Sequence, residues 1–406
     1  MEFLSAVTVE IARKYVHAIF SPFYLLLIIF IGWQYKKMQQ RQPAAQLVGY
    51  SRRYLHSTLI ATLAGILGGF LGSLLLVLFG IDMARLGLIY LFAAALLLMM
   101  IHPRFLCFAY AGGLLSLISL MTGFPRIQVA DVMGLVAILH MVESLLILFT
   151  GHLDPIPVYL RTERGTVGGF NLQKFWPIPL VALMSTGVVP ISTGPESWGL
   201  LLKNSTGFYE GWGFILVPVL AILGYGELTT TAMPRHRSRS SALYLAIFSV
   251  TLLGLAVLGS YYPSLLVLAA LFGPLGHEMV IAVGLRSERR HPPIFVPPAR
   301  GVMVLDVVHR SPAEKAGLRS GDIITELNGR AVYGPADLNL SPDQLRPWLS
   351  MTVLRQGRRL VLSTGMRSYD YLGIIPVPVM DGQAVAELVP DSYGILASIR
   401  RRFGKP

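Results

Sequence analysis

Apolar runs alternate with short polar segments through the first 286 residues of the chain. A membrane-crossing helix needs roughly 20 predominantly apolar residues, and each of these runs comes near that length. We therefore predict a polytopic α-helical membrane domain over residues 1–286, with about eight or nine spans. The candidate spans are residues 16–33, 57–80, 86–101, 105–122, 131–149, 176–193, 212–230, 242–260 and 263–285. The third and fourth are short and separated only by His102-Pro103-Arg104, so a single tight hairpin is the alternative there.

The pattern changes after residue 286. Residues 287–299 contain the sequence HPPIFVPP, whose prolines predict a stiff linker. Residues 300–382 show the strands and turns of a soluble α+β domain. In residues 383–406, Ile395, Leu396 and Ile399 fall at helical spacing beside Arg400. We expect a basic amphipathic tail there, lying either on anionic membrane lipid or in solvent.

Composition agrees with a membrane protein. The chain is 53% hydrophobic and 14% charged, with a mean hydropathy of +0.59, whereas soluble domains carry about 25% charged residues. The net charge of +12 is dispersed among short loops, which argues against nucleic acid as a partner. Cys107 is the single cysteine, so neither an intrachain disulfide nor a CxxC metal site can form.

Basic residues gather in alternate loops. Because positive loops stay in the cytoplasm, this asymmetry predicts that the C-terminal domain is cytoplasmic. The richer set of loops carries Lys36, Lys37, Arg41, Arg52, Arg53, Arg104, Arg161, Arg164, Lys174, Arg235, Arg237, Arg239, Arg286, Arg289 and Arg290, against Arg13, Lys14, Arg85, Arg126 and Lys203 in the other.

Among the polar residues inside the predicted spans, we single out His140, Glu143, Glu227, His277 and Glu278. Ionisable groups are costly in lipid and often functional there. One interpretation is a proton relay or a metal site. The other is interhelical hydrogen bonding that fixes the helix bundle. Glycines at 65, 68, 69 and 72 likewise permit close contact, either between two copies of the chain or within one chain.

The segment GHEMVI at 276–281 resembles the HExxH motif of zinc proteases, in which two histidines one turn apart bind the same ion. Ile281 stands where the second histidine would be and cannot bind a metal. We therefore predict no metal, no cofactor and no catalytic residue.

Residues 300–365 carry several separate motifs: Gly301-Val302 before a strand, SPAEKAGL, GDIITELNGR and VLRQGRRLVL. Together they resemble the circularly permuted PDZ domains of bacterial HtrA-type proteases. Ser311 and Pro312 suit the start of a helix. Asn328-Gly329 predicts a two-residue hairpin. The segment YDYLGIIPVPVMDG at 369–382 adds one further strand to the predicted domain, which spans residues 300–382.

The resemblance implies a peptide-binding site. In such domains a loop before the first strand offers N–H groups to a peptide carboxylate, and the peptide pairs along the strand. Leucines on a second helix, begun by LSPD at 340–343, would line the side-chain pocket. The residues concerned are Ala299, Arg300, Gly301 and Val302 in the loop, Met303, Val304 and Leu305 on the strand, and Leu345 and Leu349 on the helix.

A multi-span block followed by a PDZ domain resembles the MinJ family of Firmicute cell-division topology proteins, with ILHMVESLLILFTGH at 138–152 and FGPLGHEMVIAVG at 272–284 as matching membrane segments. The resemblance implies a non-enzymatic scaffold in the cell membrane, enriched at septa and poles. It would bridge a polar DivIVA-type protein to MinD and contact other divisome components.

Two alternatives from other classes stay open on the sequence. One is a PDZ-containing transporter or receptor that uses the polar residues within its spans. The other is a site-2-type intramembrane protease, which needs a set of zinc ligands. The sequence also leaves open whether the chain forms a homo-oligomer.

Overall fold

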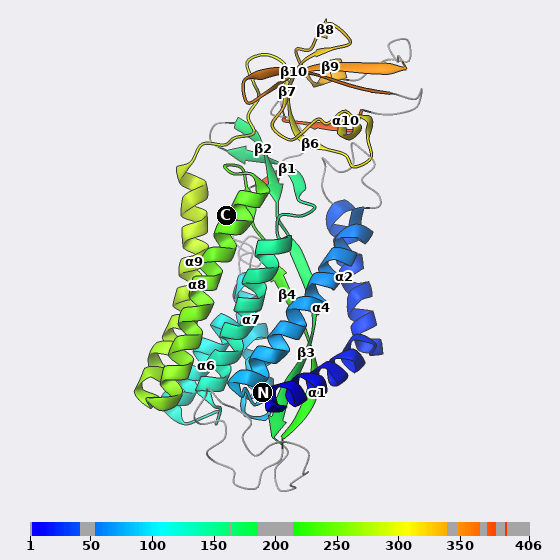
Figure 1. The fold of residues 1–406 in the computed structure, drawn as a ribbon. Helices are drawn as coiled ribbons and strands as arrows, with labels where there is room; N and C mark the ends of the chain where they lie inside the picture. The colour runs from blue at the N-terminus through cyan, green and yellow to red at the C-terminus, as the bar shows by residue number, and fades with distance from the viewer. Residues whose placement is uncertain are drawn as a thin grey trace, which may run out of the picture.

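A computed structural model describes residues 2–40, 53–162, 165–185, 214–338, 347–365, 372–378 and 386–387. The molecule is elongated (Figure 1). Long helices and a two-stranded hairpin form one body, and a smaller β-rich domain sits at one end of it. We refer to the two ends of the body as the PDZ-proximal end and the distal end.

The helices of the body are largely apolar. Four are long and apolar enough to cross a membrane, or five if the bent pair α1–α2 counts as one span, among the residues that the structure describes. This is fewer than the eight or nine spans predicted. The helices are α1 (Glu2–Ile19), α2 (Pro22–Gln40), α4 (Arg53–Phe79), α5 (Leu88–Ile101), α6 (Phe108–Thr122), α7 (Val129–Thr150), α8 (Pro234–Tyr261) and α9 (Leu266–Arg290).

The first predicted span, 16–33, is two helices. α1 and α2 meet at an angle of 59°. Pro22 begins α2, and a proline ring disfavours helical geometry in the residue before it. The Ser21 hydroxyl donates to the Ala18 carbonyl and accepts from the Tyr24 amide, so polar groups at the break are satisfied locally.

The predicted third and fourth spans are short helices joined by a 3-10 turn, η2 (Pro103–Leu106). α5 has 14 residues and α6 has 15, so each is about 22 Å long, against about 33 Å for the 22 residues of α7. The turn η2 ends at Cys107, which contacts His140 at the middle of α7. The hairpin thus enters from the distal end and turns back about halfway along the body.

The sixth and seventh predicted spans, 176–193 and 212–230, are corrected by the structure. Their described parts form an antiparallel hairpin of β3 (Lys174–Ser185) and β4 (Phe214–Tyr225), paired in register from Lys174↔Tyr225 to Ser185↔Phe214. Pro177, Pro179 and Pro218 lie inside these segments. A proline in a helix interior removes a hydrogen bond and clashes with the preceding turn, and hydropathy alone does not register that cost.

The edge of β3 that faces away from β4 is satisfied by side chains. Tyr35 accepts from the Phe175 amide at 2.9 Å, Ser73 from the Val181 amide at 2.8 Å, and Asp82 from the Ser185 amide at 3.0 Å. Pro177 and Pro179 have no amide proton. An open sheet edge is not tolerated in hydrocarbon, so these contacts satisfy that requirement along the β3 edge of the hairpin.

Glycines of α4 let β3 lie directly on the helix. A Cβ on Gly65 would lie 2.1 Å from the Pro177 carbonyl oxygen, and one on Gly69 would lie 2.1 Å from that of Pro179. Of the two uses predicted for these small residues, the structure shows packing within one chain, with a strand as the partner.

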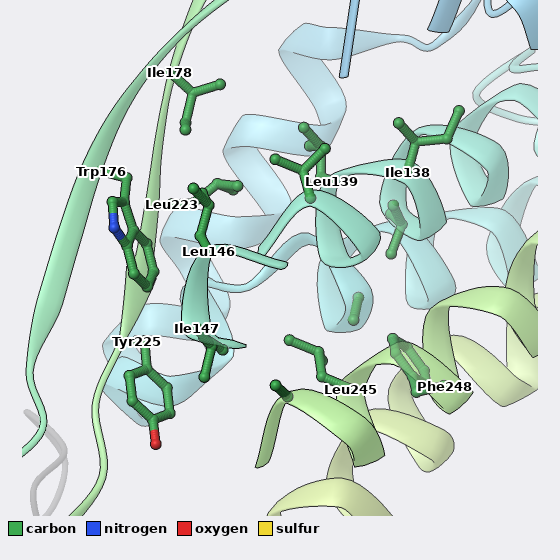
Figure 2. Close-up of a cluster of buried hydrophobic side chains, with 14 of the residues drawn as sticks. Ile138, Leu139, Leu146, Ile147, Trp176, Ile178, Leu223, Tyr225, Leu245 and Phe248 are labelled. Carbon is green, nitrogen blue, oxygen red and sulfur yellow. The ribbon is translucent and has the colours of Figure 1, made fainter. Parts of the chain in front are cut away.

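The core of the body centres on α7 (Figure 2). Of its apolar window, 72% is buried, the largest share among the four long helices. Side chains of α7 meet the β3–β4 hairpin on one side and α8 on the other. The labelled residues are Ile138, Leu139, Leu146, Ile147, Trp176, Ile178, Leu223, Tyr225, Leu245 and Phe248.

A small sheet caps the PDZ-proximal end. Its strand order is β12-β1-β2-β5, and we call it the docking sheet. Its strands are β1 (Ile156–Thr162), β2 (Gly165–Asn171), β5 (Leu228–Thr229) and β12 (Ala386–Glu387). β12 pairs in parallel with β1, so the chain returns to the body after the C-terminal domain. The rest of the predicted tail, 388–406, lies outside the described residues.

The predicted linker is folded onto the docking sheet. The Gly168 amide donates to the Phe295 carbonyl at 2.9 Å, and the Ile294 amide donates to the Thr230 carbonyl at 2.9 Å. Phe295 is 1% exposed and packs against Phe170. The linker between body and C-terminal domain is therefore held to the docking sheet by two backbone hydrogen bonds and by the buried Phe295 side chain, while most of its other residues are exposed.

The C-terminal domain is a sheet of order β10-β9-β7-β6-β11, with β8 paired to β7. Its elements are β6 (Val302–Val307), α10 (Pro312–Lys315), β7 (Ile323–Leu327), β8 (Arg330–Ala331), η4 (Pro335–Leu338), β9 (Trp348–Arg355), β10 (Arg358–Gly365) and β11 (Ile374–Pro376). Leu305, Val308, Ile375 and Val377 join the core that contains Phe170 and Tyr159 of the docking sheet.

Candidate functional site

The turns of the C-terminal domain form as the sequence predicts. Ser311 caps α10 by accepting from the Glu314 amide, and Pro312 stands at its start. Asn328 and Gly329 have φ of 51° and 78°, the left-handed pair that a tight two-residue hairpin requires. β11 is the further strand predicted from residues 369–382.

The predicted carboxylate loop leads into β6. Ala299 and Arg300 are exposed, whereas Gly301 and Val302 are buried. Gly301 has a φ of +81°, and a Cβ there would lie 2.4 Å from the Ile324 carbonyl oxygen. Glycine is thus required by the packing of this loop on β7, whether or not a peptide binds.

The strand predicted to receive a peptide has neighbours on both sides. β6 pairs with β7 at Val302↔Ile324 and with β11 at Ile374↔Val307. The Val377 amide also donates to the Met303 carbonyl at 2.9 Å. The predicted strand addition along Met303–Leu305 is therefore corrected: the chain's own β11 region takes that edge. Val304 and Leu305 are fully buried.

The predicted second helix does not reach Leu349. That residue lies in β9, paired with Thr364, and is 1% exposed in the core of the domain. The strand begins at Trp348, directly after Pro347, whose ring restricts helical geometry before it. Leu345 lies outside the described residues.

A buried ion pair ties α10, β7 and β9 together. Arg355 donates to both carboxylate oxygens of Asp322, at 2.8 and 2.7 Å, and to the Gly317 carbonyl at 2.7 Å. The Asp322 side chain is 2% exposed. The bidentate contact with Asp322 raises the pKa of the Arg355 guanidinium.

Among the predicted intramembrane polar residues, Glu227 lies in the turn after β4, at the PDZ-proximal end. It accepts hydrogen bonds from Arg237, Ser241 and Tyr225. Arg237 is buried and also donates to the Gly284 carbonyl of α9. Glu227 therefore fastens α8 to the base of the docking sheet from a turn between two strands, rather than from within the helical span predicted over residues 212–230.

His140 and His277 come together, and Cys107 joins them. The Cys107 sulfur lies 3.2 Å from Nε2 of His140 and 3.8 Å from Nε2 of His277. The three ligand atoms all lie within 4.8 Å of one another. We call these three residues the Cys–His cluster. It stands at the tip of the α5–α6 hairpin, between α7 and α9.

The other nitrogen of each imidazole is engaged. Nδ1 of His140 lies 2.7 Å from the Val136 carbonyl oxygen. Nδ1 of His277 lies 3.3 Å from the Tyr110 hydroxyl, which donates to Glu278 at 2.7 Å. Arg104 lies 3.3 Å from Glu278. Glu143, one turn beyond His140, interacts electrostatically with it.

Sequence reasoning missed Cys107, Tyr110 and Arg104 as neighbours of the two histidines. It predicted a cytoplasmic loop around Arg104, whereas the structure places that turn in the middle of the body. The shortness of the two apolar runs around HPRFLC at 102–107 favoured the single hairpin that the structure shows, but it did not indicate which helices the turn would contact.

Comparison with known proteins agrees with this architecture. Residues 303–349 match the PDZ domain family. The chain is 23% identical over 210 residues to the cell division topological determinant MinJ of Bacillus subtilis, covering 50% of each chain. It is also 34% identical over 82 residues to the serine protease HhoA of Synechocystis, covering 19% of this chain and 21% of that one. A DegP-like periplasmic serine endoprotease of Rhizobium meliloti is 40% identical over 101 residues, which is 23% of this chain and 20% of the protease.

The chain thus spans half the length of MinJ and about a fifth of each protease. The two proteases match through the PDZ domain alone, so their similarity carries no information about catalysis. The predicted resemblance is confirmed in its coarse form: the chain is similar to MinJ over half of its length and has candidate transmembrane helices and a C-terminal PDZ domain similar to those of HtrA-type proteases.

Proposed function

We propose that the chain is a non-enzymatic membrane scaffold of cell-division topology that recruits partner proteins through its PDZ domain. The observation that carries this proposal is the similarity to MinJ over 210 residues, combined with a PDZ domain held to the body by the buried Phe295 of the linker and by the linker's backbone hydrogen bonds. A PDZ domain recognises protein segments and has no chemistry of its own.

By the same resemblance, the partners are a polar DivIVA-type protein and MinD. Anchoring both at one membrane raises their effective concentration without any new contact between them. The seating of the PDZ domain on the docking sheet supports such a role, because it holds the binding surface in one orientation rather than on a flexible tether.

The PDZ domain faces the cytoplasm in this proposal. The described loops and helix ends at the PDZ-proximal end are rich in basic residues, whereas the distal half carries Arg13, Lys14, Arg85 and Arg126. Positive residues stay on the cytoplasmic side. Those at the PDZ-proximal end include Lys36, Lys37, Lys174, Arg235, Arg239, Arg286, Arg289 and Arg290.

Within the PDZ domain, the exposed loop at Ala299 and Arg300 is the proposed contact for an acidic or C-terminal carboxylate group. Arg300 provides a guanidinium that pairs with carboxylates. Because β6 is paired on both sides, we expect partners to engage this loop and the surface beside it, with Met303 half-buried at its margin. The remaining predicted residues are buried and support the sheet rather than contact a partner: Val302, Val304, Leu305 and Leu349.

The test is the position of a fluorescent fusion to the full chain in dividing cells of the native host. We expect enrichment at septa and poles, and co-purification of the polar and Min-type proteins. Arg300→Glu should weaken co-purification, while Arg330→Glu, which reverses an exposed charge on β8, should not. A uniform membrane signal for the unmodified fusion would overturn the scaffold proposal.

A further inference from the structure

The Cys–His cluster has the composition of a metal site. It gathers one sulfur and two imidazole nitrogens from three separate segments of the body. Thiolate and imidazole are the ligands that Zn²⁺ takes in proteins. The search for an HExxH motif could not find this set, because only His277 belongs to that segment.

The distances fit a shared ion. Tetrahedral Zn²⁺ with Zn–S near 2.3 Å and Zn–N near 2.05 Å places sulfur and nitrogen about 3.6 Å apart. The two observed separations, 3.2 and 3.8 Å, lie on either side of that value. Small movements of the side chains would bring all three atoms to bonding distance of one ion.

Proton positions favour a metal over a plain hydrogen-bond network. Nδ1 of His140 faces a carbonyl oxygen and must therefore carry the proton. The Tyr110 hydroxyl uses its proton on Glu278, so it accepts from Nδ1 of His277. Both Nε2 atoms then present lone pairs to Cys107, whose thiol has one proton and can satisfy one of them. A cation satisfies both and replaces that proton.

The outer shell is also that of a metal site. Metal-binding histidines characteristically donate their second nitrogen to a carbonyl or to a group held by a carboxylate. His140 donates to the Val136 carbonyl, and His277 donates to the Tyr110 hydroxyl, which Glu278 holds in place. Phe248 packs on both imidazole rings, at 5.4 and 5.8 Å between centroids, and excludes water from one side. Glu278, which accepts from the Tyr110 hydroxyl, supplies negative charge near the ion.

We propose that Cys107, His140 and His277 bind a Zn²⁺ ion within the body of the protein. The ion ties the tip of the α5–α6 hairpin to α7 and α9. It therefore acts as a structural staple for a hairpin that does not cross the bilayer, with Tyr110 as a positioning residue for His277.

The first experiment uses the unmodified full chain, purified in detergent. Cys107 is the single cysteine, so the rate of thiol alkylation, followed by mass spectrometry, reports on this one atom. We expect added Zn²⁺ to slow alkylation at least about 10-fold, since a metal-bound thiolate is shielded, and a chelator to restore the rate. An unchanged rate with Zn²⁺ would overturn the proposal.

Variants then test each ligand with Co²⁺ as a spectroscopic probe. A thiolate–Co²⁺ charge-transfer band should appear in the unmodified chain and vanish in Cys107→Ser, and Co²⁺ affinity should fall at least about 100-fold in His277→Gln. Tyr110→Phe should lower it about 10–100-fold, the range for outer-shell groups. His291→Gln, an exposed histidine at the other end of α9, is the matched control. Equal Co²⁺ binding by Cys107→Ser and the control would also overturn the site.

Discussion

The Tyr159 hydroxyl donates a hydrogen bond to the Pro376 carbonyl oxygen at 2.9 Å, across 217 residues of sequence. It joins the docking sheet of the body to β11, the edge strand of the PDZ domain. Pro376 has no amide proton to donate, and its carbonyl already accepts from Tyr159. Neither backbone group of Pro376 is therefore available to pair with a further strand at that edge. The docking of the domain and the closure of its sheet are therefore linked.

Replacing Tyr159 with Phe should loosen this docking. The change removes one hydrogen bond, worth about 1 kcal/mol, and leaves the Pro376 carbonyl without that partner. We expect faster amide hydrogen exchange at Val377 and Ile375, measured on the purified full chain. Tyr333→Phe, at a position 79% exposed, should leave that exchange unchanged. Identical exchange in the two variants would show that the bond does not hold β11.

High pH should act on the same bond. Burial raises the pKa of Tyr159 to about 12, above the usual value near 10. A raised pKa means that folding favours the protonated phenol, so its contribution is complete below about pH 10 and is lost as pH rises toward 12. In the unmodified chain, amide hydrogen exchange at Val377 should therefore accelerate between about pH 10 and 12 by more than the ordinary base catalysis of exchange accounts for. The excess should be missing in Tyr159→Phe.

Gly69→Ala should destabilise the body. The added methyl would fall 2.1 Å from the Pro179 carbonyl oxygen, so α4 and β3 must separate, at a cost of about 1–3 kcal/mol. Gly254→Ala is the matched control, because nothing lies within 4 Å of its Cβ position in α8. Thermal unfolding in detergent should show a lower midpoint temperature for Gly69→Ala than for the unmodified chain, and an unchanged midpoint for Gly254→Ala. Equal midpoints would mean that the helix and strand are less closely packed.

Asp322→Asn should destabilise the PDZ domain strongly. The Asp322 side chain is 2% exposed, and removing one partner of a buried pair typically costs about 3–5 kcal/mol. Arg359→Gln disrupts the exposed pair with Glu326 and should have little effect. Protease susceptibility of the C-terminal domain distinguishes them. Resistance of Asp322→Asn equal to that of Arg359→Gln would contradict the prediction.

Gly301→Ala should unfold the start of β6 rather than block a ligand. Its φ of +81° is costly for any other residue by about 1–2 kcal/mol, and the methyl would contact the Ile324 carbonyl. Gly334→Ala, with open space at its Cβ position, should be tolerated. Proteolysis of the PDZ domain measures both, and a stable Gly301→Ala would show that the loop can move away from β7.

Local signals in the sequence predicted the PDZ domain well. Ser311, Pro312 and the Asn328-Gly329 pair each determine a short piece of backbone through their own stereochemistry, and the structure confirms each. Long-range pairing was less accessible. Nothing local in GIIPVPV indicates that β11 takes the edge of β6, since that choice depends on which strand lies beside which after folding.

In the body, hydropathy located buried segments but not their secondary structure. Pro177, Pro179 and Pro218 argued against helices, and a reading that weighed those prolines over apolar length would have predicted strands. The Cys–His cluster was harder to predict. His140 and His277 were singled out as polar residues in apolar surroundings, but Cys107 joins them only because the α5–α6 hairpin turns back halfway along the body.

The two hairpins of the body have a consequence for topology mapping. The α5–α6 hairpin enters and leaves at the distal end, so in a bilayer it adds no crossing, and the β3–β4 hairpin crosses twice. Two predicted spanning helices would cross the bilayer twice. Replacing them with the α5–α6 hairpin lowers the number of crossings by two, and replacing them with the β3–β4 hairpin leaves the number unchanged. The parity of the number of crossings is therefore preserved by either exchange. Sidedness inferred from loop charges thus does not depend on getting the number of spans right.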